Sequence, residues 1–150
     1  MQKFEKIIDD ILISTDIDLV NLDFTYENIT NSYWAMGIPK ETFEKSLINS
    51  LCFGVYKKNK QIGFARVISD YSTFAYLGDV FIVNNERGHG YSKILMDVLC
   101  GHPELQGLRR FCLGTRDAHT LYEKYGFKVI GQPEYWMEIK SQNIYLEEEA

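Results

Sequence analysis

The sequence predicts a single α/β domain, an α+β sandwich built around a central mixed sheet. Segments with strand-like and helix-like apolar spacing alternate along the chain in the order strands, helix, strand, helix, strand, strand. The 150 residues fit one domain of ordinary size, so residues 1–150 are expected to form one unit. With 45% hydrophobic and 25% charged residues, the composition is that of a folded protein and excludes a disordered, collagen-like or coiled-coil chain.

The first fifty residues predict helices, with one ambiguous segment. Apolar residues between positions 4 and 12 follow helical spacing, but residues 11–13 could equally form a first strand, which we favour. Residues 19–24 also have a helical pattern. Residues 39–49 predict a better helix, because Pro39 suits a first helical turn and an apolar stripe follows it.

The centre of the chain predicts strands. Residues 51–57 and 61–69 form a hairpin that turns near Asn59, and residues 74–83 form a longer strand. A helix then begins at Gly90, where the apolar spacing changes from the strand period to the helix period.

The last forty residues predict a buried strand over 110–115 and a short helix over 118–125. The strand–helix–strand unit that ends at residue 115 should have a right-handed crossover. Residues 127–130 and 136–140 predict two final strands, and the acidic tail over 147–150 is expected to fray.

Composition and charge exclude several classes of function. The chain has 21 acidic against 16 basic residues and a net charge of -5, which argues against non-specific nucleic-acid binding. No apolar run is long enough to cross a bilayer, and the first ten residues alternate charged and apolar groups, unlike a signal peptide. We therefore expect a cytoplasmic protein with no nucleic-acid and no membrane partner.

The cysteines and histidines predict neither a disulfide framework nor a metal site. The three cysteines lie far apart and none belongs to a Cys-x-x-Cys pair. His89, His102 and His119 do not fall at ligand spacing. Cys52 and Cys112 lie in apolar stretches, where we expect them to be small buried hydrophobic residues.

The most informative segment is a hydrophobic strand that runs into a glycine turn and then directly into a helix. Gly88 and Gly90 allow a large anion to approach the backbone, and the N-terminus of the helix adds N–H groups and positive potential. A phosphate or pyrophosphate is the natural ligand of such a turn. The turn lacks the Gly-Lys-Ser/Thr ending of a P-loop, and a dinucleotide fingerprint fails because position 93 is lysine. A glycine turn without a ligand remains the alternative.

Two motifs resemble the GNAT family of N-acetyltransferases. The turn, Arg87-Gly88-His89-Gly90-Tyr91-Ser92, resembles the family's Arg/Gln-x-x-Gly-x-Gly/Ala loop, and hydrophobic Ile82 precedes it by the usual five positions. Downstream, Leu121-Tyr122-Glu123-Lys124-Tyr125-Gly126-Phe127 is similar to the family's Leu-Tyr-x-x-x-Gly-Phe segment. The resemblance covers about residues 50–130, including Gly63-Phe64-Ala65 in the hairpin. The chain departs from the pattern at Ser92, where Gly or Ala is usual, and at Asp117-Ala118-His119, where an Asn is common.

The resemblance implies a mostly antiparallel sheet with helices on both faces, and acetyl-CoA as the cosubstrate, with no metal. The backbone near Ile82 would hold the oxyanion, and Tyr122 would be the general acid that protonates the CoA thiolate. The residues implied to bind acetyl-CoA are Val80, Phe81 and Ile82 on the strand and Arg87, Gly88, His89, Gly90, Tyr91 and Ser92 in the loop.

Asp79 is a candidate general base for the attacking amine. An aspartate inside an apolar strand is costly unless it is paired or functional, and many members of the resembled family carry an acid there. An ion pair with Arg66 or Arg116 explains this residue equally well. His119 and Glu27 are weaker candidates for the base.

The acceptor site is implied to lie around the first helices and the loop between them. Glu27 could attract a cationic amine, and the aromatic pair Tyr33–Trp34 could contact the acceptor from a loop. Trp34 could instead pack over the core as a lid.

The function that this resemblance implies is transfer of an acetyl group from acetyl-CoA to a primary amine by direct attack. A non-catalytic acyl-CoA sensor, or an interaction domain on the same fold, is the alternative. The presence of Tyr122 favours the enzyme, because binding alone needs no acid at the sulfur. The family's habit also suggests a homodimer, in which residues 136–140 could pair between subunits.

Overall fold

The computed structural model describes residues 1–146, which contain one six-stranded sheet and four α-helices. The strands are β1 (Glu5–Ile8), β2 (Ile11–Ser14), β3 (Leu51–Lys57), β4 (Lys60–Ser69), β5 (Phe74–Ile82) and β6 (Arg110–Leu113). The helices are α1 (Leu22–Thr30), α2 (Lys40–Ile48), α3 (Tyr91–Cys100) and α4 (His119–Glu123). The strands lie side by side in sequence order, and only β5 and β6 are parallel. The predicted mixed, mostly antiparallel sheet is therefore confirmed.

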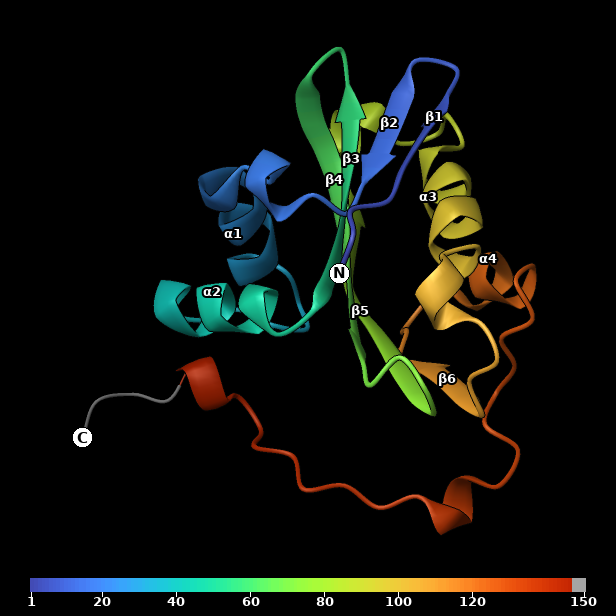
Figure 1. Cartoon of the computed structure of the whole chain (residues 1–150). Coiled ribbons are helices and arrows are strands. Elements are labelled where there is room, and N and C mark those ends of the chain that lie inside the picture. The colour runs from blue at the N-terminus through green and yellow to red at the C-terminus, as the bar shows by residue number, and fades with distance from the viewer. Residues whose placement is uncertain (147–150) are drawn as a thin grey trace.

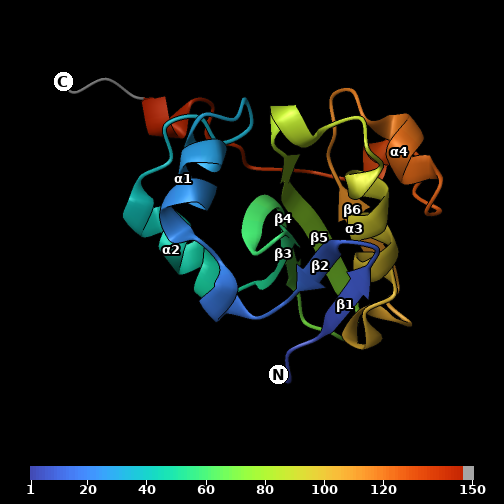
Figure 2. The same cartoon turned by 90° about the horizontal axis from the view of Figure 1, so that it is seen from above.

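Helices cover both faces of the sheet, as expected. Figures 1 and 2 show α1 and α2 on one face and α3 and α4 on the other. The face under α1 and α2 buries Phe43 and Phe64, and the opposite face buries Phe53 and Leu95 beneath α3. The sheet is thus the middle of three layers, and its strands alternate side chains between two cores.

The N-terminal segment forms strands and not a helix. β1 and β2 make a hairpin whose turn places Asp9 at a φ of 55°, so the helical spacing over residues 4–12 is misleading and the strand favoured for residues 11–13 is confirmed. The helix expected at residues 19–24 begins only at Leu22, because the Asn21 side chain accepts the N–H of Phe24 and caps it. The turn near Asn59 is confirmed, with φ of 65° at that residue.

The two final strands predicted from the sequence are wrong. Residues 127–130 and 136–140 have no strand partner among residues 1–146, and Pro133–Tyr135 forms a 3₁₀ turn between them. A strand needs a neighbouring edge to bond to. A pocket separates residues 127–130 from β6, and residues 136–140 run away from the sheet (Figure 1). The tail at 147–150, expected to fray, lies outside the described residues.

Cys52 is buried, as expected, whereas Cys112 is only half-buried on β6. Loss of water contact raises the pKa of the Cys52 thiol to about 12. The thiol of Cys52 is therefore protonated at neutral pH, as a packing residue requires.

A β-bulge interrupts the pairing of β5 with β4. Arg66 pairs with Gly78 and Phe64 pairs with Phe81, so two residues of β5, Asp79 and Val80, lie opposite one residue of β4. Asp79 has a φ of 54°, in the left-handed region that costs a non-glycine residue of order 1–3 kcal/mol. Such a bulge bends a strand and redirects its edge.

The parallel pairing of β5 with β6 ends just before this bulge. The last matched residues are Leu77 on β5 and Leu113 on β6. Beyond them, the edge of β5 through Ile82 has no strand partner on that side within the described part of the chain. The sheet therefore splays open between the two strands.

β4 approaches the end of β5 so closely that one methyl group added at Gly63 should destabilise the fold. A Cβ at Gly63 would lie 2.7 Å from the carbonyl oxygen of Phe81, so Gly63→Ala should force the backbone of β5 to move. We expect a loss of about 1–3 kcal/mol in the free energy of unfolding, measured by urea denaturation.

Gly78→Ala is the matched control, because its Cβ would make only an ordinary contact with the Tyr76 ring. It should leave the stability unchanged or raise it slightly. Equal stability of the two variants would contradict the close packing of β4 against β5.

Candidate active site

The glycine turn between β5 and α3 is open and preformed. Gly88 and Gly90 have φ of 84° and 79°, and a Cβ at either position would meet no atom within 4 Å. Gly90 is the N-cap of α3, and the first backbone bond onto it is donated by Ile94. The N–H groups at the start of α3 therefore have no helical acceptor, and the dipole of the helix adds positive potential beside them.

Two basic side chains fix this turn against the sheet. Arg87 donates from Nε to the carbonyl oxygen of Ile82 at 2.8 Å, which ties the turn to the end of β5. Lys57 on β3 forms a 3.2 Å ion pair with Glu86 and lies 5.5 Å from the centre of the Tyr91 ring. Lys57 was not predicted as a site residue, because nothing in its local sequence pattern separates it from a surface lysine at a strand end.

The register of β5 leaves the Ile82 N–H free of β4. Val83 donates to the carbonyl of Ile62 at 2.9 Å, and residues in an antiparallel pair bond to their partner at alternate positions. Ile82 therefore directs its N–H and carbonyl away from β4. The carbonyl accepts the Arg87 Nε–H, and the N–H faces the edge from which β6 has diverged.

Asp79 is buried and engaged through both carboxylate oxygens. One oxygen accepts Arg66 Nε–H at 2.7 Å, and the other accepts the Trp34 indole N–H at 2.8 Å. Arg66 also donates to the Ser50 hydroxyl at 3.1 Å. Of the two alternatives that the sequence left open for the partner of Asp79, Arg66 is the one present, and Arg116 lies elsewhere.

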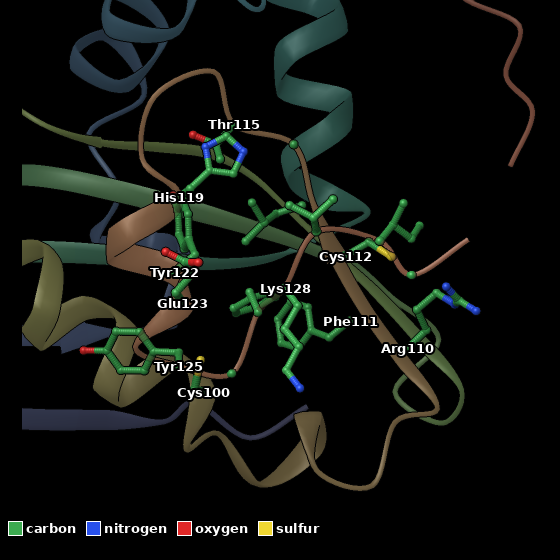
Figure 3. A pocket seen from close by; sticks show the side chains of 17 residues that line it. Cys100, Arg110, Phe111, Cys112, Thr115, His119, Tyr122, Glu123, Tyr125 and Lys128 are labelled. Atoms are coloured by element: carbon green, nitrogen blue, oxygen red, sulfur yellow. The ribbon is translucent and has the colours of Figure 1, made fainter. Parts of the chain in front are cut away.

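Tyr122 on α4 is 8% exposed. Burial, and secondarily the neighbouring Tyr33, raise the pKa of its phenol. The phenol is therefore protonated at neutral pH and can act as a proton donor. Figure 3 shows Tyr122 and His119 together on the wall of a pocket beside β6.

The loop between α1 and α2 contacts both β5 and the segment that leads into α4. Its Trp34 donates to Asp79, and its Tyr33 packs under Arg116, which precedes α4. The rings of Tyr33 and Trp34 contact each other edge-on, with their centres 5.1 Å apart. The Arg116 guanidinium stacks over Tyr33, 3.8 Å from the centre of its ring. Trp34 is 44% exposed, while its indole N–H reaches the buried Asp79 carboxylate.

The other predicted residues lie apart from this group. Glu27 is exposed on α1 and its side chain makes no hydrogen bond or ion pair within residues 1–146. His119 is exposed, and His89 packs its ring beside Tyr91 at 5.5 Å. Groups of His, Cys, Asp or Glu that could hold a metal ion are absent from the part of the chain that the structure describes.

The helices of residues 1–146 are all too short or too polar to cross a membrane.

Comparisons with known proteins agree with this geometry. A profile of the GNAT acetyltransferase domain matches residues 49–129. A Gibberella zeae protein assigned to the acetyltransferases is 31% identical over 138 residues, covering 77% of each chain. A crystal structure assigned to the GNAT family, from Xanthomonas campestris pv. campestris, superposes with a TM-score of 0.88 at 46% identity. It covers 90% of this chain and 96% of the Xanthomonas chain.

More distant structures share the fold alone. A Clostridium acetobutylicum protein assigned to the acetyltransferases, crystallised with acetyl-CoA, has a TM-score of 0.62 at 15% identity. The match covers 93% of this chain and 96% of the Clostridium chain. The family model and the closer relatives show that this chain belongs to the GNAT acetyltransferases, a family that uses acetyl-CoA. The resemblance stated from the sequence motifs is therefore confirmed.

The burial of the Arg66–Asp79 pair predicts a large effect of breaking it. Arg66→Met leaves the Asp79 carboxylate buried without its cation, and we expect a loss of about 3–5 kcal/mol in the free energy of unfolding. The measurement is chemical denaturation followed by far-UV circular dichroism.

Lys40→Met provides the control, since the Lys40–Asp23 pair has the same 2.7 Å separation but lies on the surface. It should have little effect. A similar small effect for both variants would mean that the Arg66–Asp79 pair does not hold the bulge.

Proposed function

We propose that this chain transfers an acetyl group from acetyl-CoA to a primary amine by direct attack. The observation that carries the proposal is the combination of an open glycine turn at α3 with the bulged, unpaired edge of β5 that leads into it. The turn offers N–H groups to a pyrophosphate, and the strand edge offers backbone groups to an extended amide chain. Acetyl-CoA has both parts, and its thioester supplies an activated acetyl group.

The loop residues Arg87 to Ser92 would hold the pyrophosphate. The left-handed glycines keep side chains out of the turn, and the start of α3 is half-buried with its N–H groups free for an anion. Arg87 would contribute charge as well as the bond that fixes the end of β5. The backbone of Val80, Phe81 and Ile82 would pair with the amides of the pantetheine arm, as an added strand would.

The N–H of Ile82 is the proposed oxyanion donor. It is aimed at the open edge of β5 by the register of the sheet and held there by the Arg87–Ile82 bond. A fixed backbone donor costs no reorganisation when negative charge develops on the thioester oxygen, and removal of such a donor typically costs about 2.7–4 kcal/mol.

Tyr122 is the proposed general acid for the departing thiolate. Its raised pKa keeps the phenol protonated, so its contribution persists through neutral pH and is lost only as the pH rises above the ordinary tyrosine value of about 10. Tyr122 lies on α4, across the opening between β5 and β6 from β5 (Figure 2). A thioester sulfur in that opening would lie between Tyr122 and β5, where it could accept the proton.

Asp79 has two proposed roles, as a proton acceptor and as a positioning residue. It can accept the proton of the attacking amine, or it can position Trp34 for the acceptor through the hydrogen bond at 2.8 Å. Its contacts with Arg66 and Trp34 support positioning more than proton removal, because both oxygens already accept a donor. Tyr33 and Trp34 are the residues proposed to contact the acceptor, and Glu27, exposed on α1 and apart from them, is proposed to attract a cationic amine.

A charge reversal in the turn tests cosubstrate binding. Arg87→Glu should abolish the binding of acetyl-CoA measured by calorimetry, because it places a carboxylate beside the pyrophosphate and removes the bond to Ile82. Lys45→Glu makes the same change of charge on an exposed face of α2 and should bind normally. Retained binding by Arg87→Glu would refute the assignment of the turn.

A second variant tests catalysis apart from binding. Tyr122→Phe should lower kcat by about 10²–10⁴-fold in an assay of CoA release with an amine panel, while acetyl-CoA binding remains unchanged. Tyr125→Phe is the control, because its hydroxyl bonds to Lys93 and Asp97 on α3. Full turnover by Tyr122→Phe would exclude the acid role, and binding without turnover in the wild type would favour the acyl-CoA sensor.

A further inference from the structure

The aromatic pair that is proposed to contact the acceptor carries an arginine. The Arg116 guanidinium lies 3.8 Å from the centre of the Tyr33 ring, and that ring meets Trp34 edge-on. Tyr33 and Trp34 are 49% and 44% exposed, and Arg116 is exposed as well, so a small molecule can reach all three side chains. A positive charge therefore lies at the surface where the acceptor is proposed to bind.

Arg116 is free to bind an anion. A guanidinium has five N–H donors in one plane, and stacking on a ring occupies the face of that plane while its edges stay free. The arginine side chains that donate hydrogen bonds within residues 1–146 are Arg66 and Arg87, and Arg116 is not among them. The next residue, Asp117, forms no ion pair with Arg116 in this part of the chain. Two adjacent donors of a guanidinium match the two oxygens of a carboxylate.

The other arginine near the acceptor is already engaged. Arg66 donates to the Asp79 carboxylate at 2.7 Å and to the Ser50 hydroxyl at 3.1 Å, and its side chain is 17% exposed. The second oxygen of Asp79 accepts the Trp34 indole N–H. This ion pair is neutral as a whole, so the charge that is left for an acceptor to meet beside Trp34 is that of Arg116.

The loop that carries the aromatic pair adds no charge of its own. Residues 31–39 contain no acidic and no basic residue. Glu27 lies apart from the stack, so it does not cancel the charge of Arg116 and still offers a carboxylate to an ammonium group. An acceptor with positive charge alone is repelled by Arg116, whereas an acceptor that also has a carboxylate gains a charge-assisted pair.

We propose that the acceptor is an amine that also carries a carboxylate, as an amino acid does, and that Arg116 binds this carboxylate while Tyr33 holds the guanidinium in place. The inference rests on the proposed acetyl transfer and names its substrate class. The neutral amine nitrogen bonds to the acetyl carbon and the C–S bond breaks. The nitrogen loses one proton, the CoA thiolate gains one, and the carboxylate is unchanged.

Pairs of amines that differ only in the carboxylate test this class. The common α-amino acids, β-alanine and 4-aminobutyrate are each compared with the amine that remains when the carboxylate is removed, for example tryptophan with tryptamine. CoA release is measured at saturating acetyl-CoA, and each rate is corrected to the concentration of neutral amine. The best acceptor should be one with a carboxylate, and its kcat/KM should exceed that of its partner about ten- to a hundred-fold.

Variants of Arg116 test whether this residue gives the preference. Arg116→Gln should raise KM for the carboxylate-bearing amine about ten- to a hundred-fold and leave KM for its partner unchanged. Arg116→Lys, which keeps the charge but not the planar fork, should retain part of the preference. Arg109→Gln is the control, because Arg109 is exposed at the opposite end of β6 and should keep the full preference.

The two members of a pair separate binding of the carboxylate from a structural role of the stack. If Arg116 only held Tyr33 in place, Arg116→Gln would slow both members alike, and the inference would be wrong. Equal turnover of both members of every pair by the wild-type protein would also overturn it, while the acetyl transfer itself would stand. If acetyl-CoA binds but no amine of the panel is acetylated, both the acetyl transfer and this inference are overturned.

Discussion

The bulge at Asp79 is the feature on which the candidate site depends. Two residues of β5 lie opposite one of β4 there, and the pairing of β5 with β6 ends two residues earlier, at Leu77. The left-handed conformation of Asp79 is unfavourable by itself, so it requires compensation. The half-buried Arg66 guanidinium provides this compensation, since its ion pair holds the buried Asp79 carboxylate in place. A regular β5 would continue to pair with β6 and leave no open edge.

The same aspartate links the open edge to the helical layer on the other face. Its bond to Trp34 fixes the loop between α1 and α2, and Tyr33 of that loop packs under Arg116, just before α4. Residues from three distant parts of the sequence therefore contact one another near the opening between β5 and β6. The Arg66–Asp79 ion pair therefore holds the strand edge that is proposed to bind acetyl-CoA. Through Trp34 it also positions the aromatic side chains that are proposed to contact the acceptor.

The sequence predicted the parts of this protein that local patterns determine. The β3–β4 hairpin, β5, α3 and the turn at Gly88 and Gly90 follow from apolar spacing and glycine placement. The Arg66–Asp79 pair was one of the alternatives, but the choice between Arg66 and Arg116 needed the register of β4 against β5. The bulge was not predicted, because Val80, Phe81 and Ile82 form an unbroken apolar run, and such a run does not show which residue of β4 each of them faces. The two false C-terminal strands failed for a related reason: alternation does not say which edge a strand will meet.

Amide NMR of the ¹⁵N-labelled protein during a titration with CoA would locate the cosubstrate site. We expect the largest shifts at the N–H groups of Ile82 and of residues 88–92, which are the open edge and the open turn. The β4–β5 turn at Tyr71 and Ser72 should not move, because it lies at the opposite end of β5 from Ile82. Saturable binding that shifts other amides while leaving Ile82 and the turn unchanged would contradict the claim that the bulge and the glycine turn together form the cosubstrate site.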